Sequence, residues 1–216
     1  MQFISYLING ISLGSVYAII ALGYTMVYGI AKMLNFAHGD IIMVGSYVVY
    51  IAVSSLGLNP ILSVVISAIL CLVLGVVIEK VAYKPLRHAS KLAVLITAIG
   101  VSYFLQNVAL LIFGANTKSF TSVVPAVSLK LGGITITAET IVTIVACIVI
   151  MICLTLFINK TKAGHAMQAV SEDQDAAQLM GINVNATISL TFAIGSALAA
   201  VAGVLLCSAY PSLTPY

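Results

Sequence analysis

Long apolar runs dominate the sequence and decide what it can fold into. Crossing about 30 Å of hydrocarbon takes a helix of about 20 apolar residues, because each residue adds 1.5 Å. Five firm runs are present: 3–30, 61–78, 92–113, 139–158 and 184–208. A sixth run, 33–53, is interrupted near its start by polar and glycine residues. The sequence therefore predicts an all-α fold, a polytopic transmembrane helix bundle with about six membrane passages, one of them a broken helix.

Composition indicates that lipid is the main solvent of these runs. The chain is 62% hydrophobic and 7% charged, whereas soluble domains carry about 25% charged residues. Its few basic residues form no clustered basic face of the kind that binds DNA, so no nucleic-acid partner is expected. The four cysteines lie inside apolar runs, and no spacing among them is typical of a metal site or a disulfide framework.

The connections between the runs carry nearly all the basic residues. Seven lie on one side of the predicted topology: Lys32, Lys80, Lys84, Arg87, Lys91, Lys160 and Lys162. The alternate connections hold only Lys118 and Lys130. Because cytoplasmic loops collect Lys and Arg, we predict that 79–91 and 159–183 lie in the cytoplasm, and that the N-terminus and Tyr216 face outward. The first run lacks the basic start of a cleaved signal peptide, which favours a retained span.

One polar segment, "SEDQDAAQLMGIN" (171–183), separates two apolar runs. Ser171 and Gln174 fit a capping box at a helix start. The three acidic residues of the segment then lie in the first turn, where the helix dipole favours anions. Gly181 fits the left-handed position just beyond a helix end. These features predict a short capped helix over 172–180.

Two roles are open for this predicted helix. It is either an interfacial helix that completes the connection, or a docking element on which Ala176 and Ala177 let a partner's surface approach closely. The upstream "GHAMQAV" is expected to add a further turn or two of helix. The pair would then form a helix–turn–helix on the cytoplasmic side.

A second polar segment, "NFAHGD" (35–40), lies inside a membrane passage. Asp40 is eight residues beyond Lys32, roughly 12 Å along a helix, and an ionised acid in hydrocarbon costs a few kcal/mol. In one interpretation Asp40 caps a helix that starts at Ile41, with His38 wetted by headgroups. In the other, Asn35, His38 and Asp40 border a translocation path, where irregular backbone is tolerated beside protein or water. The two interpretations are compatible.

Other residues inside the runs favour packing roles. Gln106 and Asn107 are expected to be buried amides, and Tyr17, Tyr24 and Tyr28 lie on one helix face that we expect to be core. A Gly-Ser-x-x-Ala-x-x-Ala pattern occurs twice, which indicates close helix packing or an internal repeat. Its residues are Gly14, Ser15, Ala18 and Ala21, then Gly195, Ser196, Ala199 and Ala202.

The motifs together resemble a known family. "DAAQLMG" matches the Glu-Ala-Ala-x-x-x-Gly element of permease subunits of bacterial ABC importers, with Asp175 in place of the glutamate. With "LINGISLGSVYAIIALGYTMVYGI" and "LNFAHGDIIMVGSYV", the whole chain resembles the branched-chain amino acid permeases of the LivH type. Members of that family continue through further membrane segments. The chain therefore looks like a permease domain, 1–216, that lacks the C-terminal part and has a cytoplasmic coupling loop at 159–183.

The resemblance implies a role and a set of partners. It implies that Asp175, Ala176, Ala177 and Gly181 belong to a coupling helix that sits in a groove of an ATPase subunit. It also implies a second permease subunit of similar fold, an extracytoplasmic solute-binding protein, and residence in the bacterial inner membrane. The transported solute would be leucine, isoleucine or valine.

The sequence contains no motif of an enzyme. It has no G-x-x-x-x-G-K-[ST] phosphate loop and no H-E-x-x-H, so ATP is expected on a separate ATPase subunit, with no cofactor or metal in this chain. Two alternatives remain: an ATP-independent secondary transporter or channel for small polar solutes, and a structural membrane protein without transport. Ion-driven carriers usually place a charged residue within a firm span, and only Asp40 and Glu139 come near membrane depth.

Overall fold

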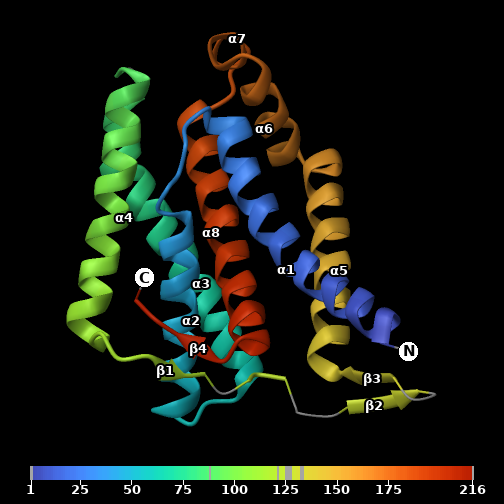
Figure 1. Ribbon diagram of the computed structural model, residues 1–216. Coiled ribbons are helices and arrows are strands. Elements are labelled where there is room, and N and C mark those ends of the chain that lie inside the picture. Colours follow the sequence, from blue (N-terminus) through green and yellow to red (C-terminus); the bar gives the residue numbers. More distant parts are fainter. Residues whose placement is uncertain (1, 88, 121, 125–127, 132–133, 216) are drawn as a thin grey trace.

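The computed structural model describes residues 2–215 except 88, 121, 125–127 and 132–133, and its helices form a bundle (Figure 1). Among the described residues, five helices are long and apolar enough to cross a membrane: α1 (Gln2–Ala31), α3 (Pro60–Ile78), α4 (Lys91–Phe113), α5 (Ala138–Lys160) and α8 (Val184–Ala209). A shorter apolar helix, α2 (His38–Ser54), accompanies them. The predicted helical membrane bundle is confirmed, and each firm run becomes one helix.

The interrupted passage begins with a non-helical segment. After α1 ends, residues 32–37, here called the connecting segment, run down beside α8 before α2 begins (Figure 1). Lys32 takes a left-handed conformation at the break, with φ 55°. Helix α2 starts at His38, and its N-cap, Ala37, makes no side-chain cap. The prediction that Asp40 caps a helix starting at Ile41 is therefore wrong, since Asp40 lies inside the first turn.

Helix α8 is the centre of the bundle and packs against α1, α2 and α3. Small residues let the backbones meet there. A Cβ added to Gly75 of α3 would lie 2.0 Å from the hydroxyl oxygen of Ser196, and one added to Gly45 of α2 would lie 2.8 Å from the Cα of Ala200. Close contact of this kind replaces the hydrophobic effect as the source of helix association in lipid.

The small-residue pattern is fully buried on α8 only. Its four α8 members are all buried: Gly195, Ser196, Ala199 and Ala202. On α1 the corresponding Gly14 and Ala21 are exposed. The two copies therefore make different contacts, and the buried line of α1 runs instead through Val16, Ile19 and Gly23.

The two ends of the bundle carry different small elements. At one end lie a π-helical turn, a 3-10 turn and two short helices: η1 (Glu79–Tyr83), η2 (Lys84–Leu86), α6 (Lys162–Glu172) and α7 (Gln174–Leu179). At the other end lie two antiparallel pairs, β1 (Lys118–Ser119) with β4 (Ser212–Leu213), and β2 (Ser128–Leu131) with β3 (Ile134–Thr137). The end with α7 is the one that the distribution of basic residues predicts to be cytoplasmic.

Two expectations about packing are wrong. Tyr17 and Tyr28 are 56% and 49% exposed, because the buried line of α1 passes beside them rather than through them. Asn107 is exposed, and its amide donates to the carbonyl of Tyr103, 2.7 Å away on the same helix. Gln106, by contrast, makes the interhelical contact described below. His88 and His165 stand alone in the polar connections of the sequence, without a motif, and are therefore expected to be ordinary surface residues. His165 is exposed, and His88 lies outside the described residues.

Candidate functional site

A polar contact inside the membrane joins α2 to α4. The Nε2 of Gln106 donates to the Oδ1 of Asp40 at 2.9 Å. Gln106 lies about 22 Å along α4 from its start at Lys91, at 1.5 Å per residue. Asp40 is 6% exposed. The contact therefore places a carboxylate and an amide within the hydrocarbon layer.

The Asp40 carboxylate is only partly satisfied by this contact. Its second oxygen has no hydrogen-bond partner among the described residues. Within the same residues the one ion pair joins Glu79 to Arg87, so no cation there neutralises Asp40. No group of three His, Cys, Asp or Glu side chains in the described part could hold a metal ion. A buried acid with so few partners reduces stability, which makes it a candidate for function.

Asn35 and His38, which precede Asp40 in the chain, are buried as well. Asn35 is 2% exposed, and its Oδ1 accepts a hydrogen bond from the hydroxyl of Tyr83 at 3.1 Å. His38 is 3% exposed and meets the ring of Tyr24 edge-on at 6.0 Å. The expectation that headgroups wet His38 is wrong, because the connecting segment carries it down to the level of Gly23, inside the bundle.

Of the three residues between these polar groups, Ala37 is buried and the other two face outward. Phe36 is 46% exposed, and Gly39 is also exposed. Asn35, His38 and Asp40 do not line the pocket of about 380 Å³ that opens where the connecting segment begins. The segment 35–40 thus presents an apolar side chain and bare backbone to its surroundings and keeps its polar side chains turned inward.

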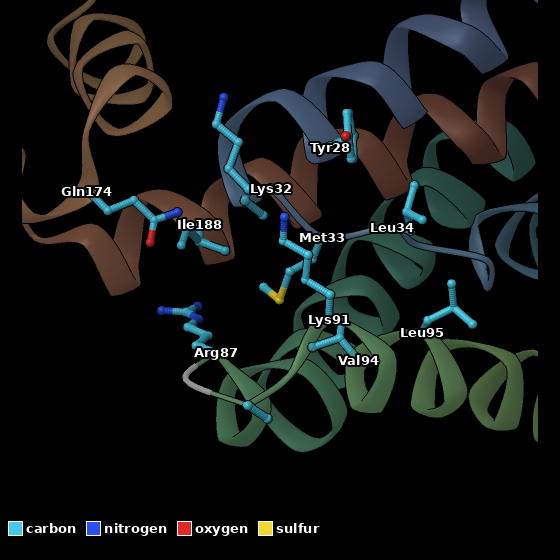
Figure 2. Close-up of a pocket in the computed structure, with 12 residues that line it drawn as sticks. Tyr28, Lys32, Met33, Leu34, Arg87, Lys91, Val94, Leu95, Gln174 and Ile188 are labelled. Carbon is cyan, nitrogen blue, oxygen red and sulfur yellow. The ribbon is translucent and has the colours of Figure 1, made fainter.

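A pocket of about 380 Å³ opens where the connecting segment begins. Met33 and Leu34 of this segment form part of its wall, with Gln174 from α7. Figure 2 shows Lys32, Arg87 and Lys91 among the side chains around it. The pocket connects the loop that carries α7 to the segment that leads down to Asp40. It has an apolar wall, a basic rim and no acidic lining residue.

Helix α7 forms the tip of the molecule (Figure 1). Its N-cap is Asp173, whose Oδ1 accepts from the backbone N–H groups of Asp175 at 2.9 Å and Ala176 at 3.0 Å. The predicted capping box at Ser171 is wrong, because α6 continues to Glu172 and the Ser171 hydroxyl donates back to the carbonyl of Gln168. The expected helix–turn–helix is confirmed, with α6 as its first helix.

The end of α7 agrees with the sequence. Gly181 has φ +85°. Its N–H donates to the carbonyl of Gln178 at 3.0 Å, and the N–H of Ile182 donates to the carbonyl of Ala177 at 3.0 Å. This pair of bonds is a Schellman motif, which needs a left-handed residue at the position of Gly181. The predicted left-handed glycine is confirmed, and it fixes the direction in which the chain leaves α7 for α8.

The faces of α7 differ sharply. Asp175 and Ala176 are exposed, whereas Ala177 is 4% exposed and packs into the core of this chain. Of the two alanines only Ala176 is therefore open to a partner. The most exposed large apolar side chains in this region are Leu179 at 89% and Met180 at 83%. Neither residue belongs to the contact predicted from the sequence, although "QLMG" places two large apolar residues at the end of a polar helix.

Comparison with known proteins identifies relatives along the whole chain. A family model described as "Branched-chain amino acid transport system / permease component" matches residues 6–216. The high-affinity branched-chain amino acid transport system permease protein BraD of Pseudomonas aeruginosa is 42% identical over 99% of this chain and 74% of its own length. LivH of Escherichia coli is 40% identical over 100% of this chain and 74% of its own length. A probable LivH of Methanocaldococcus jannaschii is 31% identical over 87% of this chain and 61% of its own length. No solved structure matches.

Proposed function

Because this chain belongs to the permease components of branched-chain amino acid transport systems, we propose that it moves leucine, isoleucine or valine into the cytoplasm at the expense of ATP. It is a multi-pass membrane protein and one component of a multi-subunit ABC transport system. ATP is bound by separate ATPase subunits, and the chain itself needs no cofactor. The other proposed partners are a second permease subunit of similar fold and an extracytoplasmic solute-binding protein.

The exposed tip of α7 is the observation that carries this proposal. Leu179 and Met180 stand almost fully exposed on a short polar helix outside the membrane-length helices. Burying one such side chain is worth about 1.5–3 kcal/mol, so the pair favours a partner that covers it. We assign the contact with an ATPase groove to Asp175, Ala176, Leu179 and Met180. Ala177 and Gly181 shape the helix from behind, Ala177 by packing inward and Gly181 by its left-handed turn.

The proposed translocation path runs past the connecting segment. Two features support it: the partly satisfied Asp40 carboxylate at membrane depth, and the pocket that reaches Met33 and Leu34 from the α7 side. Irregular backbone at this depth is tolerated where it is buried in protein or lines a cavity. In this proposal Asn35 and His38 hold the broken helix in place, the Asp40 carboxylate borders the path, and the exposed Phe36 and Gly39 lie on the path itself.

Association with an ATPase separates this function from an ATP-independent carrier. Affinity purification of the tagged permease from its own cells, in mild detergent, is expected to recover an ATPase subunit at constant stoichiometry. The control is a tagged permease that lacks α7 and is present in the membrane at the same level. It should recover no ATPase subunit. A permease that is purified without any ATPase, and whose purified form still transports, would contradict the proposal in favour of a secondary transporter.

A further inference from the structure

An ion-paired cluster around the buried Glu79 lies at the end of α3 that faces α7. Glu79 opens η1 and is 0% exposed. Its Oε1 accepts from the Arg87 guanidinium, and its Oε2 accepts from the Ser189 hydroxyl at 2.6 Å. Arg87 also donates to the side chain of Asn185. These four residues, here called the Glu79 cluster, tie η1 and the loop after η2 to the first turns of α8.

Burying the ion pair of this cluster costs desolvation free energy, so its presence is not explained by packing alone. Taking a carboxylate and a guanidinium out of water is expensive, and apolar residues of similar volume often stabilise as well or better. The best-attested use of such a buried pair is to fix one arrangement among alternatives. The turn that carries Glu79 is itself π-helical, a geometry found frequently at functional sites.

The same turn contacts the connecting segment. Tyr83, four residues after Glu79, is fully buried, and its hydroxyl donates to Asn35 at 3.1 Å. The Tyr83 ring also packs on the ring of Phe192 of α8, with centroids 5.2 Å apart. One five-residue turn is thus bonded to α8 through Glu79 and to the connecting segment through Tyr83.

The first turns of α8 follow α7 almost directly. The Schellman motif at Gly181 fixes the exit from α7, and Asn183 caps α8 by accepting from the N–H of Ala186 at 3.0 Å. Asn185 and Ser189, both in the Glu79 cluster, lie within the next two turns. A displacement of α7 therefore reaches the cluster through a short, hydrogen-bonded stretch.

We propose that Glu79, Arg87 and Tyr83 are positioning residues that transmit movement of α7 to the connecting segment. The Glu79 cluster receives the movement through the start of α8, and the hydroxyl of Tyr83 passes it to Asn35. Glu79 and Tyr83 contact neither ATP nor solute in this mechanism, and Arg87, which also lines the pocket described above, acts through its ion pair with Glu79. The inference rests on the proposed function, since it takes an ATPase at α7 and solute beside segment 35–40.

The test is the number of leucine molecules imported per ATP hydrolysed by the assembled transporter in proteoliposomes. Tyr83→Phe keeps the ring against Phe192 and removes only the hydroxyl. It is expected to lower the ratio about fivefold, the effect of one lost hydrogen bond. Glu79→Gln leaves Arg87 buried without its counter-charge and is expected to lower the ratio about tenfold or more. Arg87→Gln should match Glu79→Gln.

Matched controls make the result specific. Tyr103→Phe changes an exposed tyrosine of α4, and Lys84→Gln an exposed cation three residues before Arg87, and both should leave the ratio unchanged. A purely structural role would reduce the amount of assembled transporter and leave the ratio as it was. An unchanged ratio in Tyr83→Phe and Glu79→Gln would overturn the inference, and Tyr83→Phe alone decides if Glu79→Gln does not assemble. Failure of the unaltered transporter to couple uptake to ATP would instead refute the proposed function.

Discussion

Replacing both Leu179 and Met180 with aspartate is expected to weaken association with the ATPase severely and to reduce ATP-driven uptake with it. The two side chains are 89% and 83% exposed, so their loss removes no packing inside this chain. Each is worth about 1.5–3 kcal/mol when buried in a partner, and together they should weaken ATPase binding about 100-fold or more. Binding of purified ATPase to the variant in detergent measures the effect directly.

Gln178→Asp is the matched control for this double variant. It places a negative charge on the same exposed surface of α7 without removing an apolar side chain. Its ATPase binding should stay within a few-fold of the unaltered protein, and the level of both variants in the membrane should be normal. Tight ATPase binding by the Leu179→Asp/Met180→Asp variant would mean that the ATPase docks elsewhere.

Replacing Asp40 with leucine is expected to reduce uptake strongly while leaving a stable, ATPase-bound permease. The change removes a buried carboxylate that has one hydrogen-bond partner among the described residues, so it relieves a desolvation cost. Asp40→Asn keeps an acceptor for Gln106 and removes the charge. Uptake should fall about tenfold or more in Asp40→Leu and less in Asp40→Asn, because a polar group at this depth keeps the site open to water.

Two measurements on the same samples distinguish a role of Asp40 in the translocation path from a role in packing. Thermal unfolding of Asp40→Leu should occur at or above the temperature found for the unaltered protein, and copurification of the ATPase should be complete. Normal uptake by both variants would reduce Asp40 to a dispensable residue of the first turn of α2. Loss of uptake that only follows loss of protein would likewise remove Asp40 from the path.

The membrane helices could be predicted from the sequence because lipid thickness fixes their length. The apolar run 61–78 became Pro60–Ile78, and 184–208 became Val184–Ala209. The left-handed conformation of Gly181 could also be predicted, because a glycine just after a helix commonly takes this conformation and ends the helix. In each case the physical constraint acts on neighbouring residues in the chain.

The N-cap of α7 could not be predicted from local sequence patterns alone. Ser171 and Asp173 are both good cap residues, and a choice between them depends on where α6 ends. The structure continues α6 to Glu172, so Asp173 becomes the cap and Ser171 bonds back into its own helix. The burial of Ala177 could not be predicted either, because it depends on the core residues against which α7 packs rather than on the sequence of α7 itself.

The tertiary contacts of the candidate site were not predictable from spacing. Asp40 meets Gln106 across 66 positions of the sequence, and Glu79 meets Ser189 across 110. Single residues of this kind carry no periodic signal, and their pairing depends on how α2, α3, α4 and α8 pack. The prediction that Tyr17 and Tyr28 belong to the core was wrong for the same reason. Helical spacing shows which residues share a face, but it does not show which neighbouring helix covers that face.

Reconstituted uptake tests the central claim most directly. The permease is assembled in proteoliposomes with its partner permease, ATPase and solute-binding protein, and uptake of labelled leucine is followed with and without ATP on the ATPase side. We predict uptake that requires ATP, is unaffected by dissipating ion gradients, and is reduced by excess isoleucine or valine but not by excess glutamate or arginine. Leucine uptake that proceeds without ATP, or that follows an ion gradient, would contradict the claim.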